Sequence, residues 1–202
     1  MGIAYDVMKL IDNGQRRCGV DYDGLKMCEF GSQSIRRRTY PKDHMAYTCD
    51  TDRSYPSKKY FGELGVDYTS MDLTVQMNEN QKGSFDLLTN CGMSEHVRKS
   101  QWHVFSNIHN VVRLKGAMVH SVGMFGSPLK GHSIEKCVYY MPNFFDKLAV
   151  ANGYSLEYKK VLRRKDGKGG LLSVVMIKLK DNGFMSETDF KAMGSINYNS
   201  CV

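Results

Sequence analysis

The residues best suited to chemistry lie in the stretch of residues 84–96, which reads SFDLLTNCGMSEH. Its first half is an apolar run that predicts a short buried strand at residues 85–89, and its second half turns through Gly92 into a helix. Asn90, Glu95 and His96 therefore gather just beyond the end of a strand. Ligands in open α/β sheets bind beyond the carboxyl ends of parallel strands, so this junction is expected to border a functional site.

Four side chains near this edge could move a proton during a reaction. Glu95 and His96 follow the predicted strand, whereas His120 and His132 flank a loop farther along the chain. Histidine is the side chain best matched to proton removal near neutral pH. The alternative for Glu95 is a structural place in the first turn of a helix with Ser94 as its N-cap, and for each histidine a hydrogen-bonded structural role. Their spacing matches no metal signature, so we predict no metal site.

Strands and helices alternate along the chain around these residues. Strands are predicted where apolar runs meet glycine or polar residues, at residues 25–30, 66–71, 85–89, 117–122, 154–162 and 171–179. Helices are predicted at residues 3–13, ending at Gly14, at residues 57–64, from residue 97 to a stop at residues 114–116, and at residues 142–152. Asp86 lies inside a strand and is expected to be structural, and His103 and His109 are expected on the surface of their helix.

This alternation predicts one α/β domain over residues 1–202 whose sheet is mostly parallel. The loop between the last two strands is too short for a crossover helix, so these strands are expected to pair as an antiparallel hairpin. Residues 1–24 form an N-terminal helix and lead-in. Residues 34–59 have no sustained period and are expected to form an irregular segment or a lid, and residues 181–202 a tail that covers a sheet edge.

The composition excludes several classes of protein. Of the 202 residues, 42% are hydrophobic and 24% charged, which indicates neither a disordered chain nor a membrane protein. The longest apolar run, at residues 171–177, is too short to span a bilayer. The six cysteines are scattered singly and the N-terminus lacks a signal-peptide layout, so we expect a cytoplasmic protein with reduced thiols.

The formal net charge of +7 is concentrated at residues 36–38 and 159–168. Either cluster could touch phosphate, but basic runs without interleaved aromatic residues more often form solvated surface. Nucleic acid is therefore a less favoured partner than a small molecule.

The ordered set of motifs resembles that of the class I S-adenosylmethionine-dependent methyltransferases, from residue 25 to residue 179. The segment MCEFGSQ is similar to the first motif of this family, and FDLLTNCGMSEHV to its fourth-strand motif. HNVVRLKGAMVHSV resembles the helix, turn and fifth strand that follow, and YMPNFFDKLAVANGY the helix before the hairpin. The resemblance implies a three-layer Rossmann-like fold and S-adenosylmethionine as cofactor.

The resemblance also implies where the cofactor binds. Glu29, Gly31, Ser32 and Gln33 would surround its methionine part, because the glycine lets the backbone approach closely. Asp72 is placed like the acid that accepts hydrogen bonds from both ribose hydroxyls. The turn after the fourth strand would contribute Asn90, Cys91 and Gly92. The alternative for Glu29 is a structural carboxylate with protein partners.

This sequence departs from the family pattern in two places. The glycine-rich loop is reduced to Gly31, and the segment between Asp72 and Gly83 is too short for the usual helix and third strand. The third edge strand is therefore expected to be reduced or missing. Gln76 and Asn78 are candidates for adenine recognition.

The sequence of the turn after the fourth strand excludes some classes of substrate. Amino-group methyltransferases of nucleic acids and glutamine typically carry Asn or Asp, two prolines and an aromatic residue there, whereas this chain has Asn-Cys-Gly-Met at residues 90–93. Cys91 also lacks the preceding proline of the cytosine C5 enzymes. Methylation of nucleic-acid bases by these routes is not expected.

The sequence thus predicts an S-adenosylmethionine-dependent methyltransferase that acts on an oxygen or nitrogen nucleophile of a small molecule. His132, Glu95 and His96 are the candidate catalytic residues. The alternative is a catalytically inactive protein of the same fold that contacts RNA through its basic hairpin, since a fold does not fix a function.

Overall fold

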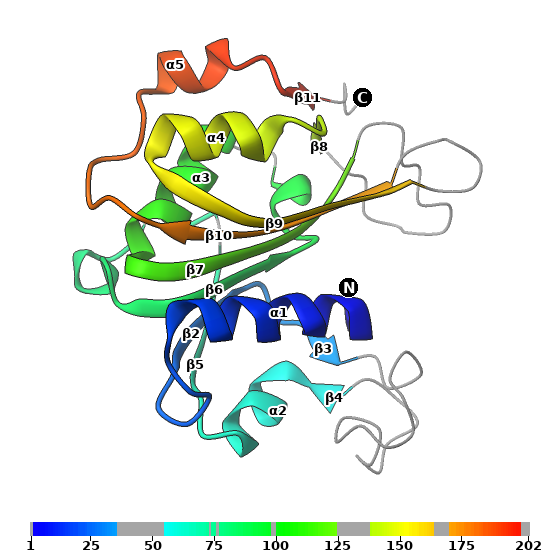
Figure 1. Ribbon diagram of the computed structural model, residues 1–202, viewed down its shortest axis with the longest axis vertical. Coiled ribbons are helices and arrows are strands. Elements are labelled where there is room, and N and C mark those ends of the chain that lie inside the picture. Colours follow the sequence, from blue (N-terminus) through cyan, green and yellow to red (C-terminus); the bar gives the residue numbers. More distant parts are fainter. Residues whose placement is uncertain are drawn as a thin grey trace.

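A six-stranded mixed sheet lies at the centre of the molecule, and helices cover both of its faces (Figure 1). The structure is a computed structural model that describes residues 2–35, 55–72, 74–75, 77–97, 100–124, 138–163 and 170–198. The strands run across the sheet in the order β5-β2-β6-β7-β10-β9. Their bounds are Lys26–Phe30 for β2, Asp67–Met71 for β5, Phe85–Cys91 for β6, Val112–Gly123 for β7, Tyr154–Arg163 for β9 and Gly170–Lys178 for β10.

The pairing of these strands confirms the predicted fold class. Strands β5, β2, β6 and β7 are parallel to one another, whereas β10 is antiparallel to both β7 and β9. Strand β5 forms one edge of the sheet, and in the described ranges no strand lies beyond it. The predicted loss of the third edge strand therefore holds for this part of the chain.

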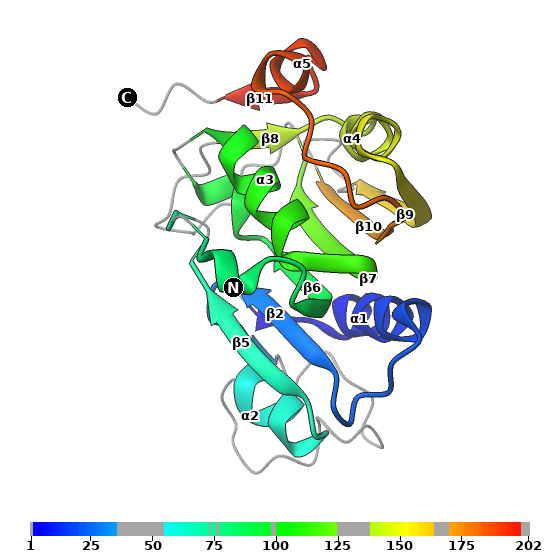
Figure 2. The ribbon, with the colours of Figure 1, turned by 90° about the vertical axis from the view of Figure 1, so that its left-hand side faces the viewer.

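Helices pack on the two faces as separate layers (Figure 2). Helices α1 (Tyr5–Cys18) and α2 (Ser57–Glu63) cover one face, and α3 (Gln101–Val111) and α4 (Phe144–Asn152) cover the other. Successive side chains of a strand point to opposite faces, so Leu87 and Val119 pack under α1 while Leu88 and Met118 pack under α3 and α4. No helix in the described ranges has the length and apolar character needed to cross a membrane.

Two small sheets lie beside the central one. Strands β1 (Gly2–Ile3), β3 (Ser34–Ile35) and β4 (Tyr55–Pro56) form the first, and β8 (Val138–Tyr140) and β11 (Ile196–Tyr198) form the second. Strands β3 and β4 bound most of the segment predicted to be irregular or a lid, and residues 36–54 between them lie outside the described residues.

The predicted end of the first helix at Gly14 is wrong, because α1 continues through this residue to Cys18. A Cβ atom at Gly14 would lie 2.7 Å from Cγ2 of Val119 and 3.0 Å from Cδ1 of Leu87. Gly14 therefore serves close packing of the helix against the sheet. The helix ends at Gly19, whose φ of 72° is readily adopted by glycine.

The helix predicted after residue 97 is shorter than expected. A single 3-10 turn, η4 (Ser94–His96), follows β6, and α3 begins only at Gln101 and ends at Val111, where β7 follows directly. The predicted surface position of His109 is also wrong, because this side chain is buried, whereas His103 is exposed as expected. His109 lies on the face of α3 that packs inward, with one ring nitrogen 2.7 Å from Oη of Tyr154.

The C-terminal tail was predicted to cover a sheet edge, and its strand β11 pairs with β8 of the second small sheet rather than with β5 or β9, the edges of the central sheet. The rest of the tail runs over α3 and α4, and its short helix α5 (Glu187–Ala192) packs on α3 (Figure 1). Trp102 Nε1 donates a hydrogen bond to the Met185 carbonyl at 2.8 Å, and His109 Nε2 lies 2.6 Å from the Asn182 carbonyl. Polar side chains of α3 thus bind backbone carbonyls of the tail and hold it against this helix.

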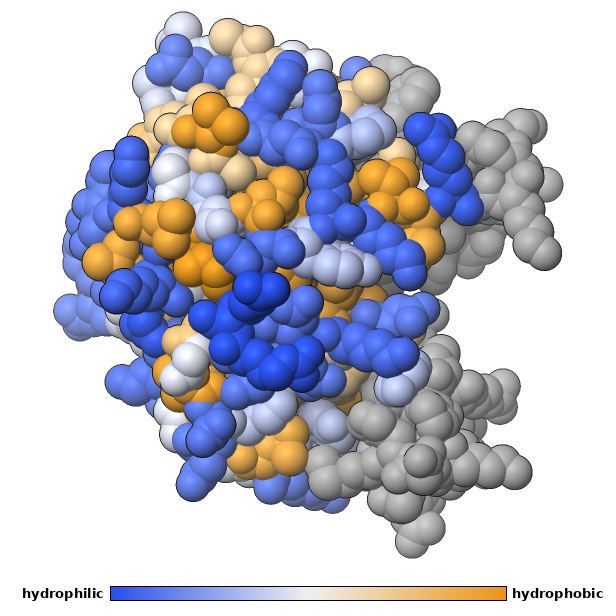
Figure 3. Space-filling view, viewed as in Figure 1, coloured by the Kyte–Doolittle hydropathy of each residue, from blue (hydrophilic) through white to orange (hydrophobic). Residues whose placement is uncertain are grey.

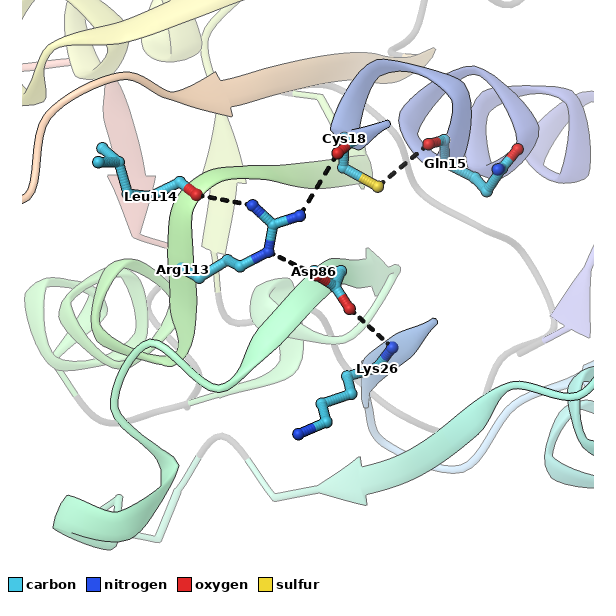
Figure 4. A network of polar contacts seen from close by, with 6 residues as sticks. All are labelled: Gln15, Cys18, Lys26, Asp86, Arg113 and Leu114. Atoms are coloured by element: carbon cyan, nitrogen blue, oxygen red, sulfur yellow. Dashed lines mark hydrogen bonds and ion pairs between the residues drawn. The ribbon is translucent and has the colours of Figure 1, made fainter. Parts of the chain in front are cut away.

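A network of charged side chains connects the strands of the sheet near the starts of β2, β6 and β7 (Figure 4). One carboxylate oxygen of Asp86 pairs with Nε of Arg113, and the other accepts a hydrogen bond from the Lys26 backbone N–H at 2.9 Å. The Arg113 guanidinium also donates to the carbonyl oxygens of Leu114 and Cys18, at 2.8 and 3.4 Å. Asp86 thus links β2, β6 and β7 to the end of α1, as its predicted structural role requires.

Asp86→Ala is expected to lower the free energy of unfolding by about 2 kcal/mol, because the half-buried guanidinium and the Lys26 N–H both lose their acceptor. Urea denaturation of wild type and variant measures this loss. Asp67→Ala, at the exposed start of β5, is the control and should stay within about 0.5 kcal/mol of wild type. Equal stability of the two variants would contradict the role given to Asp86.

Candidate functional site

The carboxyl ends of the parallel strands bring most of the predicted site residues to one edge of the sheet. Phe30 at the end of β2 is in register with Met71 at the end of β5, and the Gly31 N–H bonds the Met71 carbonyl at 2.9 Å. Cys91 at the end of β6 is in register with Ser121 of β7. The residues that follow these strands are therefore neighbours in space, although they are far apart in the sequence.

Glu29 is buried at this edge and accepts three hydrogen bonds through one oxygen. Its Oε2 atom accepts from the Gln33 backbone N–H at 3.0 Å, from Oγ of Ser57 at 2.7 Å and from Oη of Tyr68. Burial raises the pKa of the Glu29 carboxyl above its usual range, and the three hydrogen bonds act in the opposite direction. The carboxyl group thus joins the turn after β2 to α2 and β5.

Several buried polar atoms around Glu29 have no hydrogen-bond partner among the described residues. They are Oε1 of Glu29, both amide atoms of Gln33 and Oγ1 of Thr89, which is the register partner of Glu29 on β6. A buried polar atom left unpaired costs about 1–3 kcal/mol. The cluster is therefore suited to hydrogen bonds with the polar groups of a ligand or with water. Ser32, between Gly31 and Gln33, is exposed.

Gly31 is required by both its backbone angle and its surroundings. Its φ is 76°, and a Cβ atom there would lie 2.5 Å from Cε and 2.9 Å from Sδ of Met93. The Met93 side chain thus reaches across from the turn after β6 to the turn after β2. Because Cε is the far end of a flexible side chain, it can move aside for a ligand that approaches Gly31.

Asp72 directly follows β5, as predicted, and its side chain is exposed. Its Oδ1 atom accepts hydrogen bonds from the backbone N–H and from Oγ1 of Thr74, both at 2.7 Å, which fixes the carboxylate beside the turn. Of the two adenine candidates, Gln76 lies outside the described residues. Asn78 caps a 3-10 turn, η3 (Glu79–Gln81), and accepts from the Asn80 backbone N–H at 3.2 Å.

A chain of buried side chains holds the turn after β6 in place. The Asn90 amide nitrogen lies 2.9 Å from Oγ of Ser94 and 3.2 Å from Nδ1 of His120, and its oxygen accepts from the Ser94 N–H. Oη of Tyr140 lies 2.8 Å from the same Ser94 hydroxyl and 2.7 Å from Oε1 of Gln101. The Asn90 side chain is therefore occupied by the protein, so this turn can offer a ligand mainly its backbone.

The direction of these hydrogen bonds follows from the inventory of donors. Gln101 donates its amide N–H groups to the carbonyl oxygens of Ser94 and Val97, so its oxygen accepts and Tyr140 must donate to it. Asn90 donates to Nδ1 of His120, which places the histidine proton on Nε2. Burial lowers the pKa of His120 to about 3. His120 is thus a neutral structural residue, and the alternative reading of this histidine is the correct one.

The predicted catalytic residues lie in three different situations. Glu95 is buried and its Oε1 atom accepts from the Gly123 N–H at 3.1 Å, which ties the turn to the end of β7. The alternative that placed Ser94 as a helix N-cap is wrong, because the Ser94 hydroxyl lies in the buried chain. His96 is partly buried in η4, and His132 lies outside the described residues.

The other two predicted residues of the turn, Cys91 and Gly92, can contact a ligand mainly through their backbone atoms. The thiol of Cys91 is buried, and burial raises its pKa, so it stays protonated. Gly92 has a φ of 70°, and its N–H bonds the Ser121 carbonyl at 2.9 Å. No cluster of three or more histidine, cysteine, aspartate or glutamate side chains in the described ranges could hold a metal ion.

Several residues of the site were not predicted from the sequence. Ser57 and Tyr68 reach Glu29 from 28 and 39 residues away, and no local pattern indicates such a contact. Met93 lies inside the stretch that was singled out, but a flexible apolar side chain gives no chemical signal of its own. Tyr140 and Gln101 meet only through tertiary packing.

Comparisons with known proteins find similar structures but no match in sequence. No protein-family model matches the chain, and no curated protein matches it in sequence. Among solved structures, it is similar to the Burkholderia thailandensis 1,6-didemethyltoxoflavin-N1-methyltransferase, with bound 1,6-didemethyltoxoflavin and S-adenosylhomocysteine. The TM-score is 0.53 at 14% identity, over 87% of this chain and 79% of that chain.

A second similar structure is the geranyl diphosphate C-methyltransferase from Streptomyces coelicolor A3(2), in complex with Mg2+, geranyl diphosphate and S-adenosylhomocysteine. Its TM-score is 0.51 at 11% identity, over 85% of this chain and 77% of that chain. At such identities the likeness establishes the fold. The Rossmann-like methyltransferase fold that the motifs predicted is therefore confirmed.

Proposed function

We propose that this chain is an S-adenosylmethionine-dependent methyltransferase whose acceptor is an oxygen or nitrogen nucleophile of a small molecule. The observation that carries the proposal is the buried Oε1 atom of Glu29, which no described residue hydrogen-bonds, close to Gly31 at the carboxyl ends of parallel strands. The fold shared with two small-molecule methyltransferases supports it. The buried free thiols Cys18, Cys28 and Cys91 are consistent with a reducing cytoplasm.

The residues at the strand ends suit the parts of such a cofactor. Oε1 of Glu29 would accept a hydrogen bond from the amino group of its methionine part, and the Gln33 amide nitrogen would donate one to the carboxylate group. Gly31 would let the backbone approach closely once the Met93 side chain moves aside. The Asp72 carboxylate would accept hydrogen bonds from ribose hydroxyls, and the backbone of Asn90, Cys91 and Gly92 would border the same space.

The cofactor supplies a methyl group on a sulfonium, which an acceptor displaces in line. The protein then has mainly to align the acceptor and to remove its proton. The rigid turn that Asn90 and Ser94 hold serves the alignment, because its buried hydrogen bonds are already formed before any ligand arrives. Glu95, His96 and His132 remain the proposed groups for proton removal.

Asp72→Ala is expected to weaken binding of S-adenosylhomocysteine by about tenfold to a hundredfold, since two hydrogen bonds to a charged acceptor are lost. Isothermal titration calorimetry measures this affinity. Asp67→Ala is the matched control, because it removes an exposed acid from the opposite end of the same strand, and its affinity should stay within about twofold of wild type.

Failure of the wild-type protein to bind either S-adenosylmethionine or S-adenosylhomocysteine would overturn the proposed function. RNA binding whose affinity falls with salt, in a protein that binds neither cofactor, would favour the inactive binding protein instead. An unchanged affinity of Asp72→Ala would remove Asp72 from the cofactor site.

A further inference from the structure

A cavity of about 390 Å3 lies between α1 and the β9–β10 hairpin. Its lining includes the apolar side chains of Val7, Leu10, Leu162 and Leu171. The volume lies in the range of about 300–1,000 Å3 that is typical of small-molecule sites. Figure 3 views the side of the molecule on which α1 and β9 lie, where hydrophobic side chains are exposed among hydrophilic ones.

Two large apolar side chains in the lining of this cavity are partly exposed to solvent. Leu162 and Leu171 are register partners on β9 and β10, and they keep 37% and 39% of their surface exposed. A pair of leucines beside each other in water gains free energy when an apolar group covers them. The cavity therefore favours a ligand with an apolar body.

The charged part of the cavity favours an anion. Lys9 and Lys160 line it, and Asp6 is the one acid among the described residues of its lining. Lys160 forms no ion pair with any described residue, and the Lys9 ammonium group lies 4.2 Å from the centre of the Tyr5 ring. Two ammonium groups that pair with no described carboxylate, against the single carboxylate of Asp6, give this described part of the lining a net positive charge.

The cavity also adjoins the proposed methyl-transfer site. Its lining includes Ser121 and Ser173, whose hydroxyl groups lie 3.2 Å apart. Ser121 is in register with Cys91, and its carbonyl accepts the hydrogen bond from the Gly92 N–H. The polar end of the cavity is therefore hydrogen-bonded, through Ser121, to the turn that would border the cofactor.

We infer that this cavity binds the methyl acceptor, and that the acceptor is a small amphipathic anion with a carboxylate or phosphate on an apolar chain. The anionic group lies between Lys9 and Lys160, and the apolar chain covers Leu162 and Leu171. The acceptor role rests on the proposed function, whereas the binding site stands on the cavity and its charges.

Calorimetric titrations with decanoate, decyl phosphate and decan-1-ol, all without cofactor, test this inference. Both anions are expected to bind more tightly than the alcohol, and Lys160→Glu should weaken the anions by about tenfold while sparing the alcohol. Leu171→Asp should weaken all three ligands by about tenfold or more, because a charge replaces the apolar contact. The two anions together show whether the site prefers a carboxylate or a phosphate.

Lys160→Ala and Lys159→Ala form a matched pair of variants, since Lys159 is the next residue of β9 but pairs with Asp146 of α4. The first should weaken anion binding by about threefold to fivefold and the second by less than about twofold. Equal binding of the alcohol and the anions, no binding of either anion, or anion binding untouched by Lys160→Glu and Leu171→Asp would each overturn the inference. Anion binding by a protein that binds no cofactor would keep the site and overturn the acceptor role.

Discussion

Gly31→Ala is expected to reduce binding of S-adenosylhomocysteine by at least about a hundredfold and to lower the free energy of unfolding by about 2–3 kcal/mol. The φ of 76° strains any residue with a Cβ atom, and that atom would lie 2.5 Å from Cε of Met93. The new methyl group would also stand where the backbone should approach the cofactor. Calorimetry measures the affinity, and urea denaturation measures the stability.

Gly24 offers a matched control for this substitution. Its φ is 81°, but a Cβ atom there would have no heavy atom within 4 Å. Gly24→Ala should therefore show only the backbone strain, of about 1 kcal/mol, and should bind cofactor as wild type does. Gly31→Ala combined with Met93→Ala should regain part of the stability but not the affinity. An affinity of Gly31→Ala within threefold of wild type would contradict the place given to Gly31.

The protein is expected to lose stability as the pH falls from about 6.5 toward 4, because two buried histidines cannot take up protons in the folded state. Burial lowers the pKa of His109 to about 4 and that of His120 to about 3. The nearby Lys178 ammonium group adds to the effect at His109. The unfolded chain binds these protons near pH 6.5, so each histidine favours unfolding below that pH, by an amount on the order of 3 kcal/mol at pH 4.

The raised pKa of Glu29 acts in the opposite direction, because its protonation favours the folded state as the pH falls. Comparison with His109→Gln and His120→Gln isolates the histidine contribution, since glutamine offers hydrogen bonds and no charge. The slope of unfolding free energy against pH between 4 and 6.5 should be smaller in each variant than in wild type. Identical slopes in the three proteins would show that neither histidine is buried in its neutral form.

The positions and directions of the central strands could be predicted from the sequence because each strand carries a local signal. Apolar runs ended by Gly31, by Asp72 and by Asn90 mark the strand ends, and the short hairpin loop dictates the antiparallel pair. The same local signals placed Glu29 and Asp72 at the edge where the structure has them. Position along a strand is a property of the sequence alone, so such predictions succeed.

The wrong predictions concern contacts between distant segments. A glycine after an amphipathic stretch is typical of a helix end, which is why Gly14 was predicted to stop the first helix. The helix continues, and glycine occurs there because the sheet under α1 leaves no space for a side chain. His109 has a polar side chain in a helix, yet its partners Tyr154 and Asn182 come from 45 and 73 residues away. The C-terminal tail carries little pattern because its polar anchors are backbone carbonyls. No periodicity in the sequence encodes these partners.

Cofactor binding at the carboxyl ends of β2, β5 and β6 is tested most directly by nuclear magnetic resonance of the 15N-labelled protein during titration with S-adenosylhomocysteine. We expect saturable shifts of the Gly31, Asp72 and Gly92 amide signals at one ligand per chain, with the Gly24 and Asp67 signals unmoved. The absence of any shift, or shifts confined to the cavity between α1 and the β9–β10 hairpin, would contradict the proposed cofactor site.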